Sequence, residues 1–288
     1  MAIAAVKRLG GANARTDQDL VAVESPLSLT LSHPAITSDR ALGVLMRTPG
    51  DDEHLVLGLL HAEGVVRTVD DVVSIERRAA AEATSATGDR VHVVLAATVD
   101  AGVVPGGRPL PATSACGLCG RLSVDTLDQR RGPRGDARFS AELLASLPGR
   151  LRSGQAVFAE TGGLHAAAIF DPGGDCMALA EDVGRHNAVD KVVGALLRSG
   201  RLPATGGLLA VSGRVAFEIV QKAAMAGVAA VVAVGAPSSL AIEAARSVGM
   251  TLVGFARDGQ FNVYAGSERV TSFSATAETP PRPPGRHR

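Results

Sequence analysis

The sequence predicts an α/β protein made of a larger α/β domain and a smaller α+β domain. At 288 residues the chain exceeds the usual size of one compact domain, which favours two units. In the second half, short apolar runs alternate with amphipathic segments, a pattern typical of βαβ crossovers and a largely parallel sheet. A stretch rich in Gly and Pro at 102–111 separates the halves and indicates a connector.

The first half predicts a flexible N-terminus followed by the smaller domain. Residues 1–20 are rich in Gly, Ala and Arg, and we expect them to be irregular. The smaller domain is expected over 21–110. Its predicted elements are strands at 26–31, 72–75 and 91–95 and a helix at 54–62. Residues 111–135 are expected to form a cysteine-bearing loop and a helix that begins near Arg121.

The second half predicts the larger domain over 136–270 and a disordered tail over 271–288, which contains four prolines. Val189, Val192, Val193 and Leu196 recur at helical spacing and predict a helix. The expected helices are 185–198, 215–226 and 238–248. The expected strands are 157–160, 165–170, 177–182, 208–211, 229–234, 251–255 and 261–264.

The composition excludes several classes of protein. Lys plus Arg equals Asp plus Glu at 29 each, so no global field attracts nucleic acid or an acidic membrane. Three cysteines do not make a secreted disulfide framework, and no apolar stretch is long enough to span a bilayer. The start of the chain lacks the order of charges typical of a signal peptide. We therefore expect a cytoplasmic protein without nucleic-acid or membrane partners.

Cys116 and Cys119 are the most informative residues of the chain. Two residues separate them, so the pair can ligate one metal, cycle between dithiol and disulfide, or pass a sulfur atom. A glycine follows each cysteine, which allows tight turns and exposed thiols. A helix that begins near Arg121 would lower the pKa of a nearby thiol. Reactive or metal-bound chemistry is favoured over inert packing.

Polar loops follow the predicted strands of the larger domain. In open α/β sheets, ligands bind beyond the carboxyl ends of the strands. Glycines, arginines and helix starts in such loops suit a phosphate-bearing ligand. The loop residues in question are Arg185, His186, Asn187, Lys191, Ser212, Gly213, Arg214, 235–239 and Ala256–Gln260.

The histidines receive separate interpretations. His186 lies in the first turn of a predicted helix, where a positive imidazolium is disfavoured, so we expect it to be neutral. His165 lies inside an apolar strand and is interpreted as a core histidine with satisfied hydrogen bonds. His54 and His61 are expected on a helix surface.

Five motifs occur in one order and together resemble the formate dehydrogenase accessory sulfurtransferases, the FdhD/NarQ family. The resemblance extends over roughly 20–270. The motifs are Cys116-Gly-Leu-Cys119-Gly, Thr161-Gly-Gly-Leu-His165, Glu181-Asp-Val-Gly-Arg-His-Asn-Ala-Val-Asp-Lys191, Ser212-Gly-Arg214 and Phe217-Glu-Ile-Val-Gln-Lys222. This resemblance implies a cytidine deaminase-like fold for the larger domain and a homodimer.

The resemblance also implies a function. Sulfur would pass from a cysteine desulfurase to the molybdenum cofactor, in its bis(molybdopterin guanine dinucleotide) form, before formate dehydrogenase receives that cofactor. Cys116 and Cys119 match the family's cysteine motif, and Phe255-Ala256-Arg257-Asp258-Gly259-Gln260 matches its cofactor-binding segment. No permanently bound metal is expected. Lys191, Arg214 and Arg257 are candidate cations for the pyrophosphates.

Two alternatives remain open. Zinc deaminases combine H-x-E with P-C-x-x-C, and the chain offers His61-Ala-Glu63 and Cys116–Cys119. However, Ala115 precedes the first cysteine, and the histidine lies in the other predicted domain. The second alternative is a non-catalytic chaperone of the molybdenum cofactor whose cysteines only dock a partner.

Overall fold

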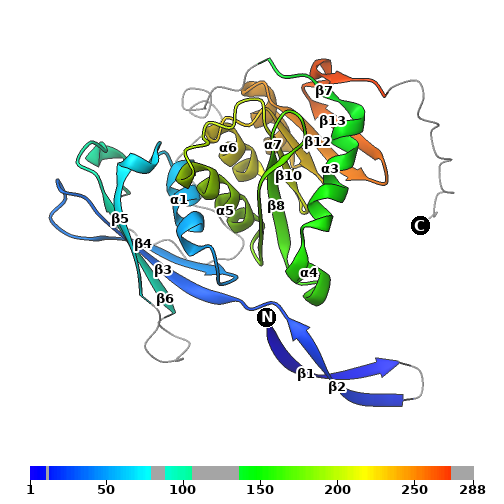
Figure 1. Ribbon diagram of the computed structural model, residues 1–288, viewed down its shortest axis with the longest axis horizontal. Coiled ribbons are helices and arrows are strands. Elements are labelled where there is room, and N and C mark those ends of the chain that lie inside the picture. Colours follow the sequence, from blue (N-terminus) through cyan, green and yellow to red (C-terminus); the bar gives the residue numbers. More distant parts are fainter. Residues whose placement is uncertain (11–12, 79–87, 106–135, 274–288) are drawn as a thin grey trace.

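The computed structural model describes residues 1–10, 13–78, 88–105 and 136–273. Figure 1 shows a small sheet with one helix beside a larger α/β body, and a β-hairpin that projects away from both. The predicted domain boundaries stay a prediction. In the described part of the chain, no helix has the length and apolar character that a membrane span needs.

The smaller domain is a four-stranded sheet covered by one helix. The strand order is β4 (Arg40–Arg47), β3 (Ser25–Ser32), β6 (Asp89–Leu95) and β5 (Val72–Arg78). Alternate residues of β3 and β6, including Leu27, Leu29 and Val91, are buried with the apolar face of α1 (Asp52–Ala62). The alternation of apolar and polar residues that predicted these strands arises because one face of the sheet is buried.

The larger domain is built on a six-stranded mixed sheet. Its order is β13 (Gln260–Ala265), β12 (Thr251–Arg257), β11 (Ala230–Ala233), β10 (Leu208–Val211), β8 (His165–Phe170) and β9 (Cys176–Asp182). Only β10, β11 and β12 pair in parallel, whereas β8, β9 and β13 pair antiparallel. The expectation of a largely parallel sheet was therefore wrong at both edges.

Helices cover both faces of this sheet (Figure 1). The helices α5 (Arg185–Arg198), α6 (Phe217–Met225) and α7 (Ser239–Ser247) contribute apolar residues to one core, and α3 (Ala141–Ser153) contributes to the other. Short strands β7 (Phe139–Ser140) and β14 (Val270–Thr271) pair in parallel and join the two ends of the domain. The three predicted helices of this domain are confirmed to within a few residues.

The two domains meet where α1 crosses α5 at two glycines. A Cβ atom built on Gly58 would lie 1.9 Å from the backbone oxygen of Asp190, and one built on Gly194 would lie 1.8 Å from that of His54. Each helix thus contacts the backbone of the other, an approach that any larger residue would prevent.

Several expectations need correction. The N-terminal residues form two antiparallel paired strands, β1 (Ala2–Gly10) and β2 (Asn13–Val21), and not an irregular terminus. The segment 157–160 belongs to the helix α4 (Ala156–Thr161), not to a strand. The sequence pattern does not predict α3, because Pro148 inside it imitates a helix break. The predicted cysteine loop at 111–135 and most of the predicted tail lie outside the described residues.

Candidate functional site

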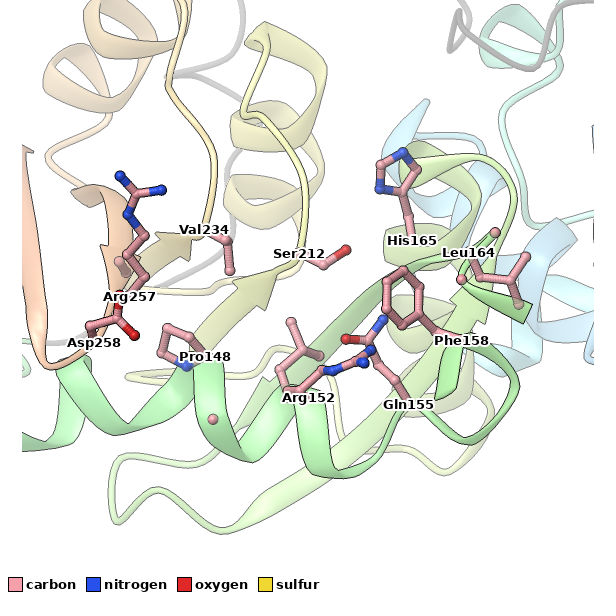
Figure 2. Close-up of a pocket in the computed structure, with 15 residues that line it drawn as sticks. Pro148, Arg152, Gln155, Phe158, Leu164, His165, Ser212, Val234, Arg257 and Asp258 are labelled. Atoms are coloured by element: carbon pink, nitrogen blue, oxygen red, sulfur yellow. The ribbon is translucent and has the colours of Figure 1, made fainter. Parts of the chain in front are cut away.

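A cavity of about 610 Å³ opens at the carboxyl edge of β10, β11 and β12. One wall comes from the residues that follow these strands, and the facing wall comes from α3, α4 and the start of β8 (Figure 2). The polar side chains in its walls are Arg152, Gln155, His165, Ser212, Arg257 and Asp258. The volume lies within the range of small-molecule sites, and the place is where α/β sheets bind ligands.

Glycines allow the strand-end loops to pack closely. The backbone N–H of Gly235 donates to the oxygen of Gly213 at 3.1 Å, and the N–H of Phe255 donates to the oxygen of Gly235 at 3.1 Å. A Cβ atom on Gly235 would lie 2.8 Å from the oxygen of Gly213. Because these loops extend the ladder of the sheet, the side chains they carry stay close together.

The segment 255–260 forms the tip of the β12–β13 hairpin. Arg257 pairs with Gln260, and Asp258 and Gly259 between them both have positive φ, which is the geometry of a type I′ turn. Phe255 also has a positive φ of 54° at a register shift, and the residue is 43 % exposed. Ala256, Arg257 and Asp258 line the cavity. Half of the predicted cofactor-binding segment thus reaches it.

Positive groups lie in the walls of the cavity and beside His165. Arg152 and Arg257 line it, and Arg185 and Arg214 lie close enough to His165 to act on its charge. Burial, followed by these two arginines, lowers the pKa of His165. His165 is therefore a half-buried neutral group in the cavity wall, and not the satisfied core histidine that we expected. This environment favours an anionic ligand.

His186 is buried beside the cavity region. Burial first, and then the charge of Lys222, lowers its pKa to about 3, so the imidazole is neutral as expected. Neither ring nitrogen has a hydrogen-bond partner among the described residues, and Nε2 lies 4.0 Å from a carboxylate oxygen of Glu218.

Asn187 and Lys191 take part in a buried network between the domains. The Lys191 ammonium lies 2.8 Å from the Asp182 carboxylate and donates to the backbone oxygen of Thr48 at 3.0 Å. The amide of Asn187 donates to the backbone oxygen of Met46 at 2.8 Å and to Asp182 at 2.9 Å. Neither side chain lines the cavity, so these two predicted binding residues hold β4 against α5 instead.

His61 is buried, contrary to our expectation of a surface residue. Its Nδ1 lies 3.1 Å from the backbone oxygen of Val66, and its Nε2 lies 3.2 Å from that of Met225. Both nitrogens therefore face backbone carbonyls and not an open metal position. Within the described ranges, no group of three potential ligands gathers around a metal position. Cys116 and Cys119 lie outside the described residues, and Cys176 is exposed.

Arg152, Gln155 and Phe158 line the cavity, although the sequence reasoning gave them no role. Arg152 lies at the end of α3, and Gln155 is the N-cap residue of α4. Phe158 lies in α4, where a strand was expected at 157–160. The only signal near them is the motif Thr161–His165, which follows directly in the sequence.

Comparisons with known proteins agree on one family. The sequence model of the FdhD/NarQ family matches residues 22–271. A protein of Nocardia farcinica, named sulfur carrier protein FdhD, is 44 % identical over 277 residues, which cover 95 % of this chain and 96 % of the relative. A protein of that name from Anaeromyxobacter sp. is 46 % identical over 276 residues, covering 90 % of this chain and 91 % of the relative.

A solved structure has the same fold. The crystal structure of a putative formate dehydrogenase accessory protein from Desulfotalea psychrophila superposes with a TM-score of 0.71 at 23 % identity. The match covers 94 % of this chain and 99 % of that chain.

Proposed function

Because the chain belongs to the FdhD/NarQ family, we propose that it is a sulfur carrier protein required for the activity of formate dehydrogenase. The observation that carries this proposal is the identity of 44 % with a sulfur carrier protein over nearly the full length of both chains. The proposed sulfur donor is a cysteine desulfurase. The proposed acceptor is the bis(molybdopterin guanine dinucleotide) form of the molybdenum cofactor, on its way to formate dehydrogenase.

The transfer uses Cys116 as carrier. Its thiolate attacks the terminal sulfur of the desulfurase persulfide, the sulfur–sulfur bond of the donor breaks, and the donor cysteine leaves as a thiolate. Cys116 then holds the persulfide. Attack by Cys119 on the inner sulfur forms a Cys116–Cys119 disulfide and releases hydrosulfide to the metal, which has a high affinity for soft sulfur. The two thiols supply the two electrons that reduce the sulfur, so a reductant of the cytoplasmic thiol type must restore them.

The cavity supports the second half of this role. Arg257 and Ser212 lie at the carboxyl edge of the parallel strands, where a pyrophosphate fits the arginine fork and a hydroxyl donor. Ser212 Oγ accepts the N–H of Ala166 at 2.9 Å, which leaves its own proton free to donate to a ligand. The larger domain would thus hold the nucleotide part of the cargo in a cytidine deaminase-like fold, within a homodimer.

The experiment is intact and peptide mass spectrometry of the protein after incubation with cysteine and a cysteine desulfurase. We expect a gain of about 32 Da, one sulfur atom, on the peptide that contains Cys116. Cys116→Ala should lose this gain and should no longer support formate dehydrogenase activity. Cys176→Ala is the matched control, because Cys176 is an exposed free cysteine outside the motif.

The alternatives give different results. A pure chaperone would keep supporting formate dehydrogenase with Cys116→Ala. A zinc hydrolase would contain stoichiometric zinc after purification and would gain no sulfur.

A further inference from the structure

The pair of strands β1 and β2 exposes large apolar side chains. Figure 1 shows that this strand pair projects away from both domains, and its base meets α4 of the larger domain. Ile3 is 69 % exposed, and Leu20, which lies opposite Ile3 in the register of the two strands, is 38 % exposed. Met1 and Val21 nearby are exposed as well. Exposed apolar side chains that lie together on a surface indicate a contact with another molecule.

The strand pair is also too small a sheet to be stable by itself. Among the described strands, β1 and β2 pair with each other and form a sheet of their own. The pairing runs without a register shift from Ala2 with Val21 to Gly10 with Asn13. An isolated sheet of two strands is at best marginally stable in water, whereas three or more strands with an apolar face are stable. The strand pair therefore needs a further strand along one of its edges.

The two outer edges of this sheet differ in charge. The strand β2 carries Asp17 and Asp19, and charged side chains on an edge strand oppose pairing with another chain. Residues 2–6 of β1 are Ala-Ile-Ala-Ala-Val and carry no charge. The outer edge of β1 is therefore the edge that accepts a further strand.

The uncharged part of β1 is complementary to itself. An antiparallel pairing of two copies about a two-fold axis at Ala4 places Ala2 opposite Val6 and Ile3 opposite Ala5, so only apolar side chains meet over residues 2–6. The product is one sheet of four strands, in which Ile3 and Leu20 of both copies lie on the same face. A two-fold contact of this kind is complete with two chains and does not continue into a fibre.

We propose that β1 is the surface through which two copies of this chain associate, edge to edge and antiparallel, into a continuous four-stranded sheet. This inference rests on the proposed function, because the homodimer named there needs such a surface. The partner is a second copy of the chain, since the apolar segment 2–6 matches its own reversed copy and pairs no like charges.

The test is the mass of the full chain in solution, measured by sedimentation velocity. The wild type should sediment as a dimer. Two double variants, Ile3→Lys with Ala5→Lys and Ile3→Glu with Ala5→Glu, each place like charges opposite one another across the two-fold axis. Each variant should raise the dissociation constant of the dimer about ten-fold or more. Leu20 and Gln18, which lie opposite these positions within one chain, are uncharged, so neither variant brings like charges together inside the strand pair.

An equimolar mixture of the two variants should form dimers again, because lysine then lies opposite glutamate. This rescue separates a charge effect at the contact from a loss of folding. Val73→Lys is the matched control: Val73 is 68 % exposed on the edge strand β5, as Ile3 is on β1, and this variant should stay a dimer.

A monomeric wild type, dimeric double variants or a mixture that stays monomeric would each overturn the proposed contact. The gain of one sulfur on the Cys116 peptide, measured in the same samples, tests the sulfur transfer separately. Its absence from the wild type would count against the proposed function, while the sedimentation result alone decides the role of β1.

Discussion

Substitution of Gly58 by alanine tests the contact between the two domains. The added methyl group would lie 1.9 Å from the backbone oxygen of Asp190 and 2.6 Å from its carbonyl carbon. These are atoms of a helix backbone, which cannot rotate away as a side chain can. The helices α1 and α5 must therefore separate, and their buried apolar contacts must loosen.

The size of the effect follows from two opposing contributions. Overpacking of a rigid interface costs about 3 kcal/mol, the upper part of the usual range, because backbone meets backbone here. Alanine in place of glycine inside a helix stabilises the helix by about 1 kcal/mol. The net loss is about 2 kcal/mol, which corresponds to a fall of roughly 4–8 °C in melting temperature for a protein of this size.

The assay is thermal unfolding followed by circular dichroism, with Gly149→Ala as the control. Gly149 lies within α3, and apart from its chain neighbours and the backbone of its own helix, no atom of the described residues lies within 4 Å of the position that a Cβ would take. Gly149→Ala should therefore raise the melting temperature, because only the helix-propensity gain remains. A rise of similar size in Gly58→Ala would refute the close packing of α1 against α5.

Two further predictions concern buried charged and titratable groups. Lys191→Met leaves the Asp182 carboxylate buried without its cation. The free energy of unfolding, measured in urea, should therefore fall by about 3–5 kcal/mol. A loss below about 1 kcal/mol would contradict the buried network. Burial is the main cause that lowers the pKa of His186 in the folded chain to about 3, whereas its pKa in the unfolded chain is 6.5. At a pH between these two values only the unfolded chain binds a proton at this imidazole. The free energy of unfolding therefore falls as the pH drops below 6.5. Between pH 7.5 and 5 the wild type should lose about 2 kcal/mol more than His186→Asn in urea unfolding, and equal losses would contradict the buried neutral imidazole.

The spacing of apolar residues correctly predicted those helices and strands whose buried face is formed by residues of the same segment. The helix 185–198 shows its apolar face in the spacing of Val189, Val192, Val193 and Leu196, and all four are buried. The strands of the smaller domain alternate apolar and polar residues because only one of their faces is buried. By contrast, α4 is capped by Glu181, more than twenty positions further along the chain, and no local pattern contains that contact.

The sequence pointed to those cavity residues that lie at the ends of predicted strands. Ser212 follows β10 and Arg257 ends β12, and strand ends are where sequence alone can place a ligand. Lys191 also follows a strand, but its partners include the backbone of Thr48 in the other domain, so its burial could not be predicted from its own segment. Gln155 is the N-cap residue of α4, a helix in which the sequence pattern predicted a strand at 157–160, and its exposure to the cavity depends on the fold of α3 and α4.

The Asp258–Gly259 turn has a kinetic consequence for the cavity. A two-residue turn between paired strands leaves this part of the wall ordered before any ligand arrives. A ligand that contacts Arg257 then loses little affinity to the ordering of protein segments on this side. Association should accordingly be limited by diffusion and orientation, and differences in affinity between ligands should appear in their residence times.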